Sequence, residues 1–86
     1  MGVVDDLADD LARETLEAQS EIGDDRFYTE VARIVGASSP TLQEAFLTSM
    51  RIRMAAARGK VFLEKALRAK REGGKAPEAP PDRSAH

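Results

Sequence analysis

Residues 39–72 read SPTLQEAFLTSMRIRMAAARGKVFLEKALRAKRE, and this stretch decides the fold. We expect it to form one long helix, because Ser39 can cap its start and Pro40 suits the first helical position. No proline interrupts the stretch, and the pair Gly73-Gly74 supplies an ending. Such a helix would extend about 50 Å at a rise of about 1.5 Å per residue, more than a globule of this size is wide. Such a helix either projects into solvent or packs on something outside its own fold, which indicates a helical interaction protein.

Two apolar surfaces run along this predicted helix. One is a coiled-coil-like seam of mostly small residues, spaced alternately by four and three, which lets another helix come close. The residues expected at an oligomer interface are those of this seam together with one leucine of the first helix: Leu11, Ala45, Ser49, Ile52, Ala56, Gly59, Leu63 and Ala66. The other surface consists of Leu42, Phe46, Met50, Met54, Ala57 and Val61. The earlier helices can cover one surface and part of the other, so we expect a homo-oligomer that buries the remainder.

Two shorter helices are expected before the long one. Residues 3–21 carry an apolar stripe and several aspartates in the first turns, where the helix dipole favours negative charge. Gly23 interrupts this pattern, and Asp24 is the expected N-cap of a second helix over residues 25–35. Gly36 would close that helix in a left-handed conformation. The predicted fold class is all-α, with an acidic N-terminal helix, a short second helix, a helix-turn-helix-like corner and a long third helix of hairpin or coiled-coil type.

The chain is long enough for one small domain. We expect residues 1–72 to form a helical oligomerisation or adaptor domain, and residues 73–86, rich in proline, alanine and glycine, to form a disordered tail. No apolar run approaches the about 20 residues of a membrane span, and the acidic N-terminus does not resemble a signal peptide. We therefore expect a cytoplasmic protein with no membrane partner.

Charge is distributed unevenly along the chain. Residues 1–30 contain ten acidic and two basic residues, a net charge of −8, whereas residues 31–86 contain eleven basic and five acidic residues, a net charge of +6. One interpretation is that the acidic first helix folds back on the basic third helix. The other is that the basic half also faces a polyanion or an acidic partner.

The sequence offers no catalytic constellation. Cysteine is absent, the only histidine is His86 in the tail, and there is no glycine-rich phosphate loop. Ser38, Ser39 and Thr41 are better explained as helix-capping residues. The aspartates of the first helix lack the glycine and the spacing of a calcium loop. We therefore expect no enzyme activity, no cofactor and no metal site.

The segment VARIVGASSPTLQEAF, residues 31–46, resembles a DNA-binding helix-turn-helix. Ala32 lies four residues before Gly36, which lets the two helices approach, and the corner would place the third helix in a major groove. The residues expected to contact DNA are Gln43, Thr48 and Arg51 as base or phosphate readers, followed by Arg53, Arg58, Lys60, Lys65 and Arg68 as phosphate contacts.

The order of these elements looks like that of the small terminase subunits of tailed phages, in particular the reduced versions of phage-derived gene transfer agents. The residues that carry the resemblance are DDRFYTEVARIVGASSPTLQEAFLTSMRIRMAAARGKVFLEKAL, residues 24–67. The resemblance implies a non-enzymatic DNA-packaging adaptor that oligomerises, often as a ring, binds DNA and engages a large terminase motor. The chain departs from the family pattern because it has no separate basic DNA-binding domain, so we expect weak, non-specific DNA binding.

Two other functions stay open. A small helix-turn-helix transcriptional regulator would read DNA through residues 36–51. A protein-binding module would instead dock a basic partner on its acidic first helix.

Overall fold

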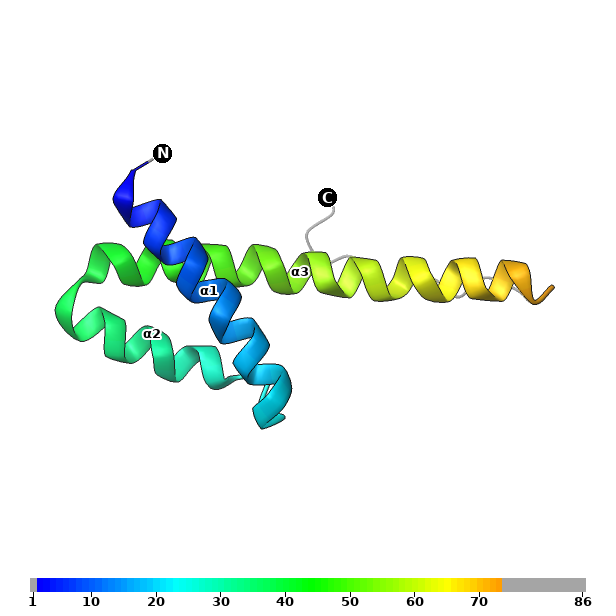
Figure 1. The fold of residues 1–86 in the computed structure, drawn as a ribbon, viewed down its shortest axis with the longest axis horizontal. Coiled ribbons are helices and arrows are strands. Elements are labelled where there is room, and N and C mark those ends of the chain that lie inside the picture. Colours follow the sequence, from blue (N-terminus) through cyan, green and yellow to red (C-terminus); the bar gives the residue numbers. More distant parts are fainter. Residues whose placement is uncertain (1, 74–86) are drawn as a thin grey trace, which may run out of the picture. The chain divides into compact units, whose positions relative to one another are not determined.

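The computed structural model describes residues 2–73, which form three helices (Figure 1). Helix α1 spans Val3–Ile22, α2 spans Phe27–Ser38, and α3 spans Pro40–Arg71. The prediction of an all-α chain with a long third helix is confirmed. None of the three helices is both long and apolar enough to cross a membrane. The prediction of a disordered tail concerns residues that, apart from Gly73, lie outside the described part of the chain.

The two ends of α3 follow the expected chemistry. Ser39 is the single residue between α2 and α3, and its backbone is extended, with φ −150° and ψ 96°. Its side-chain Oγ accepts a hydrogen bond of 3.1 Å from the backbone N–H of Leu42, as an N-cap residue does. Pro40 occupies the first helical position, where its missing N–H costs no hydrogen bond. At the other end, Gly73 adopts a left-handed φ of 74° just after the helix.

The predicted role of Gly36 is wrong. Helix α2 continues through Gly36 to Ser38, and the left-handed glycines of residues 2–73 are Gly23 and Gly73. A glycine can be required either because the backbone has a positive φ or because another group lies where a Cβ would be. At Gly36 the second reason applies, since the side-chain amide of Gln43 lies where a Cβ would stand.

The predicted N-cap of α2 is also wrong. The helix begins at Phe27 rather than at residue 25, and its N-cap position is held by Arg26 without a side-chain cap. Asp24 instead stabilises the turn before the helix, where its Oδ1 accepts a hydrogen bond of 2.9 Å from the backbone N–H of Arg26. Aspartate commonly makes this local bond to the residue two positions ahead, and the bond competes with capping.

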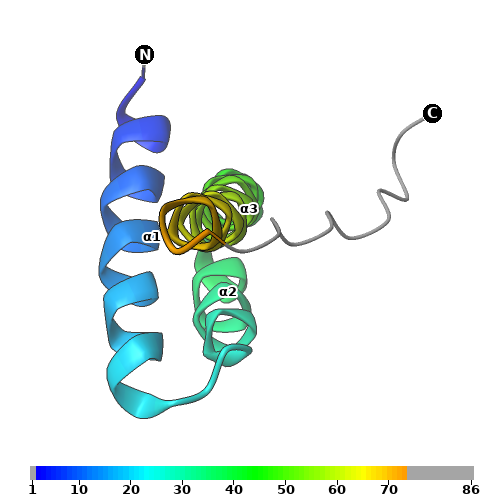
Figure 2. The same cartoon turned by 90° about the vertical axis from the view of Figure 1, so that its right-hand side faces the viewer.

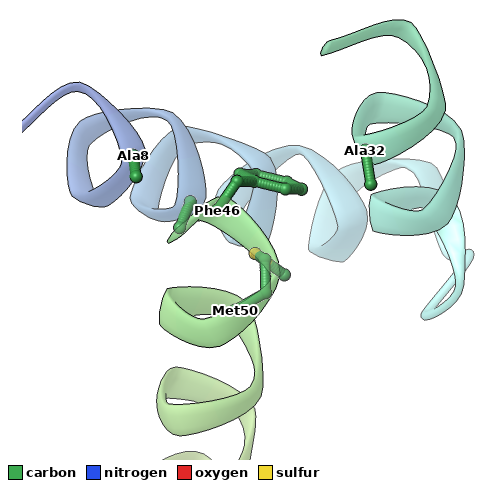
Figure 3. Packing of buried hydrophobic residues seen from close by; sticks show 5 residues of the cluster. Ala8, Ala32, Phe46 and Met50 are labelled. Carbon is green, nitrogen blue, oxygen red and sulfur yellow. The ribbon is translucent and has the colours of Figure 1, made fainter. Parts of the chain in front are cut away.

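Residues 2–55 form one compact unit around a small core. Phe46 and Met50 of α3 are fully buried there, and Figure 3 shows them between Ala8 of α1 and Ala32 of α2. The alanines let the backbones of α1 and α2 come close to the large side chains of α3, so that the core packs tightly. In Figure 2, α2 runs beside α1 after the turn that joins them.

A buried polar contact fixes that turn. Gln19 of α1 is only 6% exposed. Its Oε1 accepts a hydrogen bond of 2.6 Å from the backbone N–H of Tyr28, in the first turn of α2. The first backbone N–H groups of a helix have no partner within the helix, so the glutamine satisfies one of them from a neighbouring element.

Residues 56–73 belong to a second unit, which consists of the remainder of α3 and the turn that follows it. None of these residues is buried; Phe62, Ala66 and Ala69 are half-buried and the others are exposed. The segment contains six basic and two acidic residues, a net charge of +4.

Candidate functional site

The corner between α2 and α3 is held by one glutamine. Gln43 projects from the first turn of α3, and its Nε2 donates a hydrogen bond of 3.0 Å to the backbone carbonyl of Ala32. The same amide occupies the space over Gly36, so any larger residue there would collide with it. Gln43, predicted from the sequence to contact DNA, therefore already has a structural partner for one of its polar atoms.

An open groove of about 350 Å³ runs along this corner. Its lining combines residues of α2 with residues one turn apart on α3: Tyr28, Thr29, Ala32, Arg33, Gln43, Leu47 and Arg51. Arg33 lies within reach of Glu30, with 2.9 Å between Nη2 and Oε1, whereas Arg51 has an exposed side chain in the groove wall. The Thr29 hydroxyl already donates a hydrogen bond of 2.7 Å to the backbone carbonyl of Arg26. Arg51 is therefore the cation of this groove best placed to hold a phosphate, the anion that an arginine fork fits.

The structure places Gln43 and Arg51, two of the predicted DNA contacts, in one groove and adds residues that the sequence interpretation missed. These are Tyr28, Thr29 and Arg33. Thr29 and Arg33 are four residues apart and so share one face of α2. That spacing was visible in the sequence, but which residues of α3 the face would meet was not.

A second groove, of about 420 Å³, lies on another side of α3, between α1 and α3. Its α1 wall carries three carboxylates, Asp5, Asp6 and Asp9, and its α3 wall includes Thr48 and Arg53. The Nε of Arg53 donates a hydrogen bond of 3.2 Å to Ser49 Oγ, a neighbour on the same helix. Three carboxylates repel a phosphate, so the surroundings of Thr48 and Arg53 suit DNA contact less well than the surroundings of Arg51.

The four remaining predicted DNA contacts lie in residues 56–73: Arg58, Lys60, Lys65 and Arg68. All four are exposed. Two acidic residues, Glu64 and Glu72, accompany them in this segment, so the local field stays positive. Exposed lysines and arginines on one helix provide the long-range attraction on which sequence-independent DNA binding depends.

The residues predicted for an oligomer interface divide into two groups. In residues 2–55, Leu11 and Ala45 pack against the core and Ser49 is buried within the protomer, while Ile52 is 64% exposed. In residues 56–73, Ala56, Gly59 and Leu63 are exposed and Ala66 is half-buried. The accessible members of the predicted seam are therefore mostly those after residue 51, and their role in assembly stays a prediction.

Within residues 2–73, no group of three or more histidine, cysteine, aspartate or glutamate side chains is arranged to hold a metal ion. No protein-family model, no curated protein and no solved structure matches the chain.

Proposed function

We propose that the chain is a non-enzymatic DNA-packaging adaptor of the small-terminase type. It self-associates, binds DNA weakly and without sequence preference, and engages a large terminase motor. The observation that supports this proposal best is the basic segment of α3 after residue 55. Its side chains are almost entirely exposed and its net charge is +4, whereas residues 1–55 contain eleven acidic and five basic residues, a net charge of −6.

This separation of charge predicts where DNA binds. A duplex is repelled by the acidic unit and attracted to the basic helix, so the helix supplies the phosphate contacts. Arg58 and Lys65 are seven residues apart, which is about two helical turns, and Arg68 follows three residues later. The three cations therefore form one side of the helix, called here the phosphate face.

Binding should depend steeply on salt. If all six cations of the segment neutralise phosphates, affinity falls by about two thousandfold between about 50 and 200 mM salt, because each contact releases condensed counterions. If only the three residues of the phosphate face take part, the fall is about fortyfold. The measured slope of log affinity against log salt concentration thus gives the number of phosphate contacts.

The experiment is a fluorescence-anisotropy titration of two unrelated duplexes over a range of salt. Both duplexes should bind equally, and the triple variant Arg58→Glu, Lys65→Glu, Arg68→Glu should not bind. A triple variant with the charge retained, Arg58→Lys, Lys65→Arg, Arg68→Lys, is the matched control and should bind as the wild type does. Undiminished binding by the reversed variant would refute DNA contact through this face.

The groove at the α2–α3 corner supports a second candidate, a sequence-reading regulator of the helix-turn-helix kind. Arg33 and Arg51 line that groove beside Gln43, and arginine is the commonest reader of guanine edges. This candidate predicts a footprint on one defined site that is lost in Arg51→Ala and kept when the phosphate face is reversed. The adaptor predicts no footprint on a defined site, and its DNA binding should be kept in Arg51→Ala and lost when the phosphate face is reversed.

A further inference from the structure

A third groove, separate from the two described above, lies between α1 and the start of α3. Its volume is about 370 Å³, and its apolar part consists of Leu7, Leu11 and Leu42. Asp10 and Glu14 complete the lining; Asp10 also lies 3.7 Å from Arg13 in an exposed ion pair. Leu7 is 54% exposed, which is high for a leucine that lines an apolar groove. The groove is thus an apolar strip with negative charge beside it.

The basic segment of α3 carries a face of the opposite kind. Leu63 and Leu67 are 57% and 43% exposed, and they are four residues apart, so they are adjacent on one side of the helix. Lys60 precedes Leu63 by three residues and Arg71 follows Leu67 by four, which places both cations on the same side. Glu64 shares this side as well, since it follows Lys60 by four residues and lines one groove with Leu67 and Arg71. This docking face is thus an apolar strip beside two cations and one carboxylate, a net charge of +1. It lies away from Arg58 and Lys65, which belong to the opposite side of the helix.

We propose that the docking face of one copy binds in the Leu7–Leu11–Leu42 groove of a second copy. Leucines would meet leucines, while Lys60 and Arg71 would lie opposite Asp10 and Glu14. Complementary charge around an apolar centre selects the orientation and raises the rate of encounter. The chain carries both halves of the match, so a second copy is the occupant that the complementarity indicates. This inference rests on the self-association part of the proposed function and is independent of DNA binding.

The geometry of such an interface is head-to-tail. Each copy uses its groove for one neighbour and its docking face for another, so the contact is heterologous and repeats from copy to copy. A repeating contact of this kind closes into a ring or continues as a filament, whereas a symmetric dimer would use the same surface twice. Arg58 and Lys65 would stay free in every copy, whereas Arg68, which lines one groove with Leu67 and Arg71, would border the contact.

Cysteine substitution tests the direction of the contact, because the chain contains no native cysteine. A chain with both Leu7→Cys and Leu63→Cys, treated with a short thiol-specific crosslinker, should give a ladder of dimers, trimers and larger species. Each single variant should give no crosslink with itself, and a mixture of the two single variants should give dimers only. The matched control combines Ser20→Cys with Val61→Cys; both residues are exposed, but Ser20 lies on the side of α1 away from Leu7 and Leu11 and Val61 lies outside the docking face, so no ladder should form. Crosslinking of Leu63→Cys alone would overturn the head-to-tail arrangement.

Charge exchange tests the complementarity. Reversing the groove acids (Asp10→Lys, Glu14→Lys) or the docking cations (Lys60→Glu, Arg71→Glu) should weaken self-association by about tenfold in each case, and mixing the two variants should restore it. All four residues are exposed, so the fold should persist in circular dichroism. A wild-type oligomer that neither reversal weakens would overturn this inference alone. A monomeric wild type would also overturn the proposed function.

Discussion

Replacing Gly36 with alanine sets two opposing effects of similar size against each other. Gly36 lies inside α2 without a positive φ, so alanine suits its backbone and should stabilise the helix by about 1 kcal/mol. The new Cβ, however, would collide with the side-chain amide of Gln43. The amide is the end of a flexible side chain and can move away, but it then gives up its 3.0 Å hydrogen bond to Ala32, at a cost of about 1 kcal/mol. We therefore expect Gly36→Ala to leave the free energy of unfolding almost unchanged.

The same substitution should behave differently when the glutamine is absent. Gln43→Ala alone removes the hydrogen bond and should destabilise the protein by about 1 kcal/mol. In that background the space over Gly36 is empty, so Gly36→Ala should recover about 1 kcal/mol through helix propensity. The double variant should thus be about as stable as the wild type, with a coupling energy of about 1 kcal/mol between the two positions.

Urea unfolding of the four proteins, followed by circular dichroism, measures this cycle. Protein concentration must be held constant, because self-association would add to the apparent stability. A loss of several kcal/mol in both backgrounds would mean that the Cβ meets the backbone rather than a movable amide. A gain of about 1 kcal/mol in both backgrounds would mean that Gln43 does not lie over Gly36. Either result would refute the packing described at the corner.

Three further tests concern the compact unit. Phe46→Ala removes a fully buried ring and should destabilise the protein by about 3–5 kcal/mol, enough to abolish cooperative thermal unfolding in a unit this small. Its control is Ile34→Ala, at a side chain that is 65% exposed, which should change the free energy of unfolding by less than about 0.5 kcal/mol. Ser39→Ala should cost about 1 kcal/mol in urea unfolding and Ser39→Asp should cost almost nothing, since aspartate also caps; equal losses would argue against the cap. Gln19→Ala leaves the backbone N–H of Tyr28 without its partner, so it should lower the free energy of unfolding by about 1–3 kcal/mol. Amide hydrogen exchange at Tyr28 should also accelerate, and unchanged exchange there would contradict the contact.

The sequence predicted the elements whose signals are local. The Ser39-Pro40 start of α3 needs only the residues next to it, and so does the glycine that follows the helix. Gly36 was misinterpreted because its neighbours in sequence permit either a left-handed turn or a helix. Only Gln43, seven residues later, decides between them, and a contact between two helices is invisible in a local pattern.

The surroundings of the candidate site residues likewise depend on contacts between helices that a local sequence pattern does not show. Arg51 and Arg53 are equally basic in the sequence, and their spacing already places them on different sides of a helix. What each side faces depends on how α1 and α2 pack. Arg51 lines the corner groove with Arg33, whereas Arg53 lies in a groove with three aspartates of α1. The difference between a cationic and an acidic neighbourhood therefore comes from tertiary packing.

We propose that the chain works as an assembly. Light scattering on the purified protein at micromolar concentration and low salt measures this most directly, because the chain alone has a mass of 9.4 kDa. We expect a mass several times larger that falls as salt is raised, since charged groups surround the proposed contact. A mass of one chain throughout the concentration range would contradict it.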